Sequence, residues 1–455
     1  MPFLYAPLLF WLGGGGIALG LDGILALRLV ALASSLGVAT LIGHWVKKET
    51  GHVLPGLVAV GVFLAGYGWL YWWYDLARND SPFLLSMLLC AYALRHGGRH
   101  GWWVAALLAM VAVLAKQSAA MWLPAVGIGA LILDWRRGVK FGFAGVGAIV
   151  LALGVMHMSS EGWSTFYLFE MPTYHGSVEA NKLGFWTRDL WPMLPLVVAG
   201  ITGFVSDCRA GRGRAALFLA AVGSGGLVTS WLSRIHVGGF DNVLLYGFAG
   251  ACVLGPVAAA RLRFLPWLLV VQFVFLFVFA FAPSRVRSAL PSDAHRTAHE
   301  ELFEYVRSRP GDVFMPAHGH ITARAGKPTS AHGQAIYDLM QTLPNRADGA
   351  IDVLALQDEA RLAQLSPRVR DALVSFRDGM HAAMTSRRYS AIILDEQIRG
   401  AYLYMFRLAL VGPDGQLGTP DDLYESRPLD ALSNPKALNP LVGFAADSPS
   451  VLVPR

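Results

Sequence analysis

The chain has 455 residues, of which 55% are hydrophobic and only 15% are charged, whereas a soluble domain typically carries about 25% charge. Residues 1–284 are mostly apolar runs with short polar breaks, and residues 285–455 have the charge and proline content of a soluble domain. This composition excludes a single soluble domain. The net charge of +6 comes from basic residues in short loops between apolar runs, so it indicates membrane topology and not nucleic-acid binding.

The chain begins without the basic segment of a cleavable signal peptide. Its first apolar stretch is short and contains Gly13 to Gly16, which predicts an interfacial or re-entrant helix. A span needs roughly 20 apolar residues, and by that measure about ten transmembrane helices follow. The predicted spans are 24–46, 54–74, 81–96, 102–116, 118–133, 141–158, 191–206, 215–232, 243–260 and 265–282.

The apolar stretch from Trp102 to Leu133 is too long for one span, so the prediction divides it at Lys116-Gln117. With that division, one set of loops carries 12 basic residues and the opposite set carries five. The first set comprises Lys47, Lys48, Arg95, Arg99, Arg136, Arg137, Lys140, Arg209, Arg212, Arg214, Arg261 and Arg263. Since Lys and Arg favour cytoplasmic loops, this set is predicted to be cytoplasmic.

The opposite, outer loops carry polar groups that topology does not require. Residues 74–82 hold Asp75, Arg78 and Asp80, which read either as helix caps or as a base or metal ligand beside a phosphate-binding Arg. Lys116 lies within an apolar stretch, where it either snorkels to the interface or faces a cavity for an anionic substrate. These residues are candidates for catalysis (Asp80, Asp75) and for substrate binding (Arg78, Lys116).

Two further outer segments add candidates for substrate binding. The long loop 159–190 contains Tyr167, Glu170 and His175 among aromatic residues, a pattern that predicts a lid on the membrane surface. The segment from Arg234 to Asn242 contains a glycine pair and reads as a tight turn or as a phosphate-facing segment. Its candidates for substrate binding are Arg234, His236 and Asn242.

At these residues the sequence resembles the polyprenyl-phosphate-dependent glycosyltransferases of the GT-C type, in the family 39 and RgtA/B/C/D-like, protein mannosyltransferase-like group. The resemblance covers residues 3–283. Its motifs are the stretch Tyr5 to Trp11 with Ala26 to Leu29, the stretch Ala77 to Pro82, the turn Leu114 to Ser118, and the segment Arg234 to Asn242. By this resemblance, the sequence is expected to lack the family's usual N-terminal span and its first-loop acid.

The resemblance implies a GT-C-like, all-α polytopic bundle that transfers a sugar from a polyprenyl-phosphate donor to a hydroxyl of an unknown glycan, lipid or protein acceptor. A carboxylate takes the acceptor's proton and cations stabilise the leaving phosphate. No metal site is expected, and a divalent cation is left open as a cofactor. Expected partners are the donor, the acceptor and the bilayer of a bacterial inner membrane, and nucleic acid is not one. A lipid-linked-substrate transporter or flippase and a non-catalytic scaffold are the alternatives.

Residues 285–455 are predicted to form a soluble α/β domain on the outer, periplasmic side. Leu302, Phe303 and Val306 give helical spacing within 293–309. Strands are expected at 312–316 and 389–394, with helical stretches at 331–342 and 352–384 between them. Alternating helices and strands of this kind favour a small α/β fold.

Overall fold

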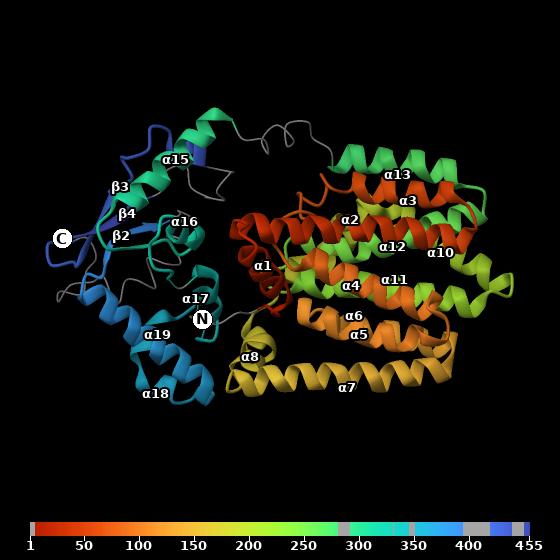
Figure 1. The fold of residues 1–455 in the computed structure, drawn as a ribbon, viewed down its shortest axis with the longest axis horizontal. Helices are drawn as coiled ribbons and strands as arrows, with labels where there is room; N and C mark the ends of the chain where they lie inside the picture. The colour runs from red at the N-terminus through yellow and green to blue at the C-terminus, as the bar shows by residue number, and fades with distance from the viewer. Residues whose placement is uncertain (1–4, 281–291, 331, 345–350, 395–418, 439–449) are drawn as a thin grey trace. The chain divides into compact units, whose positions relative to one another are not determined.

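The computed structural model describes residues 5–280, 292–330, 332–344, 351–394, 419–438 and 450–455. The chain divides into two compact units, one of residues 3–283 and the other containing residues 284–455. The first unit is a helical bundle and the second combines helices with a small sheet (Figure 1). A mainly helical bundle followed by an α/β unit confirms the predicted fold class.

The bundle contains a long helix at each of the ten predicted spans. These helices are α2 (Gly23–Thr50), α3 (Val53–Ala65), α4 (Asp80–His96), α5 (Gly101–Ala115), α6 (Ala119–Leu133), α7 (Trp135–Ser159), α10 (Leu194–Arg209), α11 (Gly213–Ile235), α12 (Leu244–Arg261) and α13 (Leu265–Ala280). Within the described residues, six segments are long and apolar enough to cross a membrane, and further apolar helices are shorter. A shorter helix, α1 (Leu8–Ala18), precedes them, as the first apolar stretch predicts.

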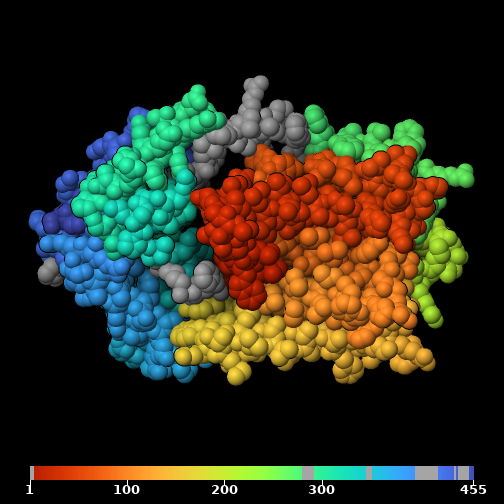
Figure 2. Space-filling view, viewed as in Figure 1, coloured from red at the N-terminus to blue at the C-terminus, as the bar shows by residue number. Residues whose placement is uncertain are grey.

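The helix α12 occupies the centre of the bundle. It packs against α2, α3, α10 and α11, and nearly all of its residues are buried. By contrast, α7 is mostly exposed and lies along one edge of the bundle (Figure 1). Figure 2 shows α2 and α7 on the surface of the bundle. Exposed leucine, valine and phenylalanine side chains on such outer helices suit contact with lipid.

Of two predicted helix boundaries, the structure confirms one and corrects the other. The division at Lys116-Gln117 is confirmed, because α5 ends at Ala115 and α6 begins at Ala119, with Lys116 in an extended conformation between them. The span predicted at 54–74 is too long, because α3 ends at Ala65 and residues 66–79 form an irregular connection. Tyr71 and Trp72 there have φ values of 47° and 59°, which a right-handed α-helix does not allow. Hydropathy alone extends the predicted span to residue 74, because it does not distinguish the aromatic residues of this connection from those of an apolar helix.

The predicted loop 159–190 is built of short helical turns. They are α8 (Trp163–Thr165), the π-turn η2 (Phe166–Glu170), η3 (Met171–Tyr174), α9 (Glu179–Gly184) and η4 (Phe185–Asp189), followed by η5 (Trp191–Met193). Clustered aromatic side chains hold these turns together, as where the rings of Trp163 and Tyr167 stack with centroids 5.8 Å apart.

The second unit contains a four-stranded sheet in the order β1-β2-β4-β3. Its strands are β1 (Asp312–Phe314), β2 (Tyr389–Leu394), β3 (Tyr424–Pro428) and β4 (Ser450–Pro454). The pair β1–β2 is parallel, and both pairs that β4 forms are antiparallel. The helix α15 (Asp293–Ser308) buries Leu302 and Val306 in a core shared with Val313 and Ile393, as its spacing predicts.

The other described elements of this unit include a helix at the predicted stretch 331–342 and several shorter elements within and outside the predicted stretch 352–384. They are α16 (Gly319–Arg324), α17 (Gly333–Met340), η7 (Val353–Gln357), α18 (Glu359–Leu362), α19 (Pro367–Thr385) and η8 (Pro435–Leu438). The single helical stretch expected at 352–384 is divided because Asp358 caps α18 through its side chain and Pro367 starts a new helix.

Candidate functional site

One end of the bundle holds a buried carboxylate with three hydrogen-bond donors. Asp80, the first residue of α4, is fully buried. Its Oδ1 lies 2.6 Å from Nζ of Lys116, and it accepts hydrogen bonds from the Tyr246 hydroxyl at 2.5 Å and from Nδ2 of Asn242 at 2.9 Å. Lys116 also donates to the Tyr246 hydroxyl at 2.8 Å. We call Asp80, Lys116, Asn242 and Tyr246 the Asp80 cluster, and this end of the bundle the Asp80 end.

The local sequence explains how the Asp80 cluster is positioned. Lys116 lies at the break between α5 and α6, and Asn242 lies in the 3-10 turn η6 (Asp241–Val243). From these positions between helices, both side chains reach Asp80 at the start of α4. Asn79 donates from Nδ2 to the carbonyl of Ala115 at 3.1 Å and so fixes the end of α5. An ionised pair this deeply buried persists only with close partners, which the Tyr246 and Asn242 side chains supply.

A second cation, Arg78, lies beside the Asp80 cluster. Its guanidinium donates to the Tyr5 hydroxyl at 3.2 Å and lies 5.4 Å from the ring centroid of Tyr5 and 5.3 Å from that of Trp73. Cation–π contacts of this length are favourable for arginine. The negative charge of the Asp80 carboxylate also attracts the Arg78 guanidinium. Arg78 and Lys116 therefore set two cations against the one carboxylate of Asp80.

The second candidate carboxylate, Asp75, is more accessible than Asp80. Its side chain is 18% exposed and forms an ion pair with Arg28, whose side chain is 50% exposed. The Tyr67 hydroxyl donates to Oδ1 of Asp75 at 2.7 Å, and Nε of Arg28 donates to the Asp75 carbonyl at 3.3 Å. Arg28 is not among the site residues predicted from the sequence. Its signal is a lone arginine in the second turn of an apolar helix, where a charge is costly without a function or a partner.

Arg234 lies in a separate ion-pair group at the same end. Its Nε donates to Asp189 at 2.8 Å and its Nη2 lies 3.0 Å from Asp241. Its Nη1 donates to the carbonyl of Gly239 at 2.9 Å, which closes the glycine-containing turn. Since Asp241 neighbours Asn242 within η6, this group adjoins the Asp80 cluster, but the arginine is already neutralised by two carboxylates.

His175 and His236 face each other with ring centroids 5.1 Å apart. Ser177 and His236 form a β-bridge, and Val178 donates its backbone N–H to the Ile235 carbonyl at 2.7 Å. Burial, followed by the nearby His236, lowers the pKa of His175 to about 4. The two histidines therefore join the long outer segment to the glycine-containing turn, with His175 in its neutral form.

Tyr167 and Glu170 both lie in η2. Burial raises the pKa of Tyr167 to about 12, so this tyrosine is a neutral packing residue at physiological pH.

Of the site residues predicted from the sequence, the structure gathers Asp80, Lys116 and Asn242 into one cluster. Arg78 lies beside this cluster, and Asp75 lies with Arg78 in the connection 66–79. The structure places Tyr167, Glu170, His175, Arg234 and His236 in other contacts. Tyr246 and Arg28 are the residues that the sequence analysis missed.

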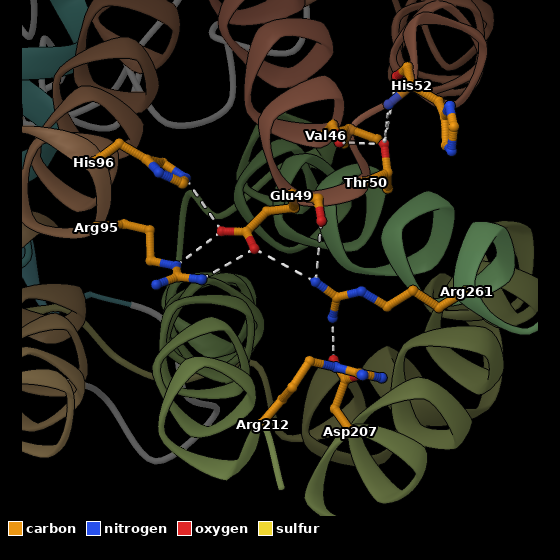
Figure 3. Close-up of polar contacts among 9 residues, drawn as sticks. All are labelled: Val46, Glu49, Thr50, His52, Arg95, His96, Asp207, Arg212 and Arg261. Atoms are coloured by element: carbon orange, nitrogen blue, oxygen red, sulfur yellow. Dashed lines mark hydrogen bonds and ion pairs between the residues drawn. The ribbon is translucent and has the colours of Figure 1, made fainter. Parts of the chain in front are cut away.

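The opposite end of the bundle carries a second buried polar group (Figure 3). Glu49 accepts from Nε of Arg95 at 2.8 Å, and His96 lies 3.1 Å from the same carboxylate. Arg261 bridges Glu49 and Asp207, and Asp207 also accepts from Nη2 of Arg212 at 2.7 Å. These six residues, the Glu49 cluster, connect the ends of α2, α4, α10 and α12, and they define the Glu49 end.

The donor sets at the Asp80 end do not fit a divalent cation. Asp75 and Asp80 are each held by a cationic side chain, and the described part of the chain contains no group of three or more His, Cys, Asp or Glu residues able to hold a metal ion. A hard cation such as Mg²⁺ requires several oxygen ligands that are not already neutralised. The arrangement is suited instead to binding an anion and to moving a proton.

Comparison with known proteins identifies the fold. No family model matches the chain, and no curated protein matches its sequence. Several solved structures match the fold, among them the crystal structure of ArnT from Cupriavidus metallidurans bound to undecaprenyl phosphate. That match has a TM-score of 0.58 and 12% sequence identity, and it covers 99% of this chain and 88% of that chain. The chain is therefore an integral membrane protein with a GT-C-type fold.

Proposed function

We propose that this chain is a membrane glycosyltransferase that moves a sugar from a polyprenyl-phosphate donor to an acceptor hydroxyl at the Asp80 end of the bundle. One observation carries the proposal: Asp75, Arg78, Asp80 and Lys116 converge at one end of an otherwise apolar GT-C-type bundle. A phosphosugar on a lipid carrier has an apolar tail that suits the helix surface and an anionic head that needs cations at the membrane interface. ArnT is bound to undecaprenyl phosphate in its crystal structure, and we extend that class of lipid to this chain.

The distribution of basic residues supports the orientation of the protein. The Glu49 end carries the loops rich in Lys and Arg, so we place it in the cytoplasm. The Asp80 end and residues 285–455 then lie outside the cytoplasm, on the periplasmic side of a bacterial inner membrane.

The two carboxylates suit different roles in this reaction. Asp75 is partly exposed, so an acceptor hydroxyl can reach it, and we assign it the role of general base. Asp80 is fully buried and one of its oxygens already accepts from three donors, so we assign it the positioning of Lys116 and Tyr246. Arg78 and Lys116 give this end a cationic character that favours the growing charge on the leaving phosphate.

The position of the charges favours a transferase over a transporter. Transporters commonly place ionisable groups near the middle of the membrane. In the described bundle helices, the Asp, Glu, Lys and Arg residues all lie within about two turns of a helix end.

The test is sugar transfer by the purified chain in lipid nanodiscs. The protein is incubated with radiolabelled hexosyl and pentosyl polyprenyl phosphates and with membrane extracts as a source of acceptors. We expect label to leave the lipid fraction with the wild type and not with Asp75→Ala. If no donor of the panel loses its sugar and undecaprenyl phosphate does not bind, the proposed function is wrong.

A further inference from the structure

The ion pair between Arg28 and Asp75 joins two segments of the Asp80 end. Arg28 projects from the second turn of α2, and Asp75 belongs to the connection 66–79 that leads to Asp80. Nη2 of Arg28 contacts Oδ2 of Asp75, and Oδ1 is held by the Tyr67 hydroxyl at 2.7 Å. Half of the Arg28 side chain is exposed, so a ligand can approach the guanidinium without unfolding the bundle.

The surface of α2 next to Arg28 is apolar. Leu25, Leu29, Leu32 and Leu36 are each more than 40% exposed, and their spacing of three to four residues puts them on one face of the helix. Arg28 precedes Leu32 by one turn and follows Leu25 by three residues, so the cation stands on the same face, near the Asp80 end of the stripe. An exposed cation at the end of an exposed apolar stripe matches a lipid that has a long hydrocarbon tail and an anionic head.

The planar guanidinium of arginine donates two parallel hydrogen bonds to a phosphate in the same way as to a carboxylate. The Asp75 carboxylate therefore occupies the position that a phosphate would take on Arg28. Competition between the two anions has a consequence for Asp75, because a phosphate on Arg28 releases the carboxylate while leaving it tethered to Tyr67.

We propose that Arg28 binds the phosphate of the lipid-linked donor, and that Asp75 holds Arg28 until this phosphate displaces it and frees the carboxylate to act as the base. This inference rests on the proposed function and deepens it, since it names the residue that meets the donor and couples donor binding to activation of the base.

The chemical step balances with these groups alone. The acceptor hydroxyl gives its proton to Asp75 while its oxygen forms a bond to the anomeric carbon of the sugar. The bond between that carbon and the phosphate oxygen breaks, and its electron pair stays on the phosphate. The phosphodiester, with one negative charge, becomes a phosphomonoester with a second charge, which Arg28 is placed to stabilise.

The test is the sign of the change in lipid affinity. Binding of undecaprenyl phosphate is measured for the full chain in nanodiscs, with undecaprenol as the ligand that lacks the phosphate. Arg28→Gln should bind undecaprenyl phosphate at least about tenfold more weakly, because the charged hydrogen bonds to phosphate are lost. Asp75→Asn should bind it about two- to fivefold more tightly, since a partly exposed ion pair competes with the phosphate by about that amount. Asp75→Asn should still lose sugar transfer.

Two controls separate this inference from a structural role of the pair. Glu179→Gln removes the carboxylate from an exposed pair with Lys182, 2.8 Å apart, and should change neither affinity nor transfer. Arg28→Lys keeps the positive charge without the paired guanidinium donors. Its affinity for undecaprenyl phosphate should lie between those of the wild type and Arg28→Gln. If both Arg28→Gln and Asp75→Asn weaken binding, the pair only ties α2 to the connection, and this inference is wrong while the function stands. If the wild type neither binds undecaprenyl phosphate nor transfers sugar, both this inference and the proposed function are wrong.

Discussion

Asp80 and Lys116 form an ion pair in the interior of the bundle, with 2.6 Å between Oδ1 and Nζ and with both side chains buried. The attraction between the two charges offsets much of the free energy lost when each is removed from water, because a lone buried charge is strongly unfavourable. The pair therefore fixes the start of α4 to the break between α5 and α6. It also means that changing one member alters the fold as well as any activity.

The first prediction concerns this pair. We expect Lys116→Met to lower the free energy of unfolding by about 3–5 kcal/mol, since it leaves the Asp80 carboxylate buried without its cation. The double variant Lys116→Met with Asp80→Asn should recover most of that loss. Thermal unfolding of the four proteins in detergent gives the coupling energy, and additive effects of the two substitutions would contradict the importance of the pair.

The second prediction concerns the Glu49 cluster. Replacement of Glu49 by Gln leaves Arg95 and Arg261 without their shared carboxylate, and we expect the free energy of unfolding to fall by about 3 kcal/mol. Because this cluster lies at the opposite end of the bundle, the affinity for undecaprenyl phosphate should stay at the wild-type value. Thermal unfolding and lipid binding measured on the same preparation check both statements, and a large loss of affinity in the folded variant would show that the two ends are coupled.

The third prediction is a dependence on pH at the outer histidines. The pKa of His175 is about 4 in the folded protein and 6.5 in an unfolded chain, so the folded state favours neutral His175. Its contribution to stability is present above pH 6.5 and is lost as the pH falls from 6.5 towards 4. The backbone amide of Val178 donates to the Ile235 carbonyl. We expect this amide hydrogen to exchange faster at pH 4.5 than at pH 7.5, after correction for intrinsic exchange rates.

His175→Asn provides the control for this experiment, because asparagine does not titrate in that range. The ratio of the corrected exchange rates at the two pH values should approach one in the variant. An unchanged ratio would assign the acid sensitivity to another group.

The fourth prediction concerns Asp338 in the second unit. Burial raises the pKa of this carboxyl group to about 7, although a hydrogen bond from Gln334 acts in the opposite direction. A pKa raised from 3.8 means that the protonated form favours folding, and that stability is lost as the pH rises from 3.8 through 7. Asp338→Asn should therefore protect the amides of α17 more strongly than the wild type at pH 8, with little difference at pH 4. Hydrogen exchange on the full chain measures this, and equal protection at pH 8 would contradict it.

The positions of the long helices follow from the amino-acid sequence alone. Apolar runs of sufficient length can satisfy their backbone hydrogen bonds in lipid only as helices, so hydropathy located all ten long helices. A buried lysine interrupts such a run at high cost, and for that reason Lys116 marked the end of a helix correctly. The same reasoning failed at residues 66–74, where aromatic residues are apolar but pack as an irregular connection.

The pairing of the charged groups depends on how the helices pack and could not be read from the sequence. Arg28 and Asp75 are 47 residues apart in the chain, and Asp80 and Tyr246 are 166 residues apart. Sequence spacing fixes the neighbours of a residue along its own helix, but contacts between helices depend on how side chains of several segments pack. From the sequence, Tyr246 is one more aromatic residue of an apolar helix and Arg28 is a lone charge. The packing of α12 against α4 brings Tyr246 to Asp80, and the packing of α2 against the connection 66–79 brings Arg28 to Asp75.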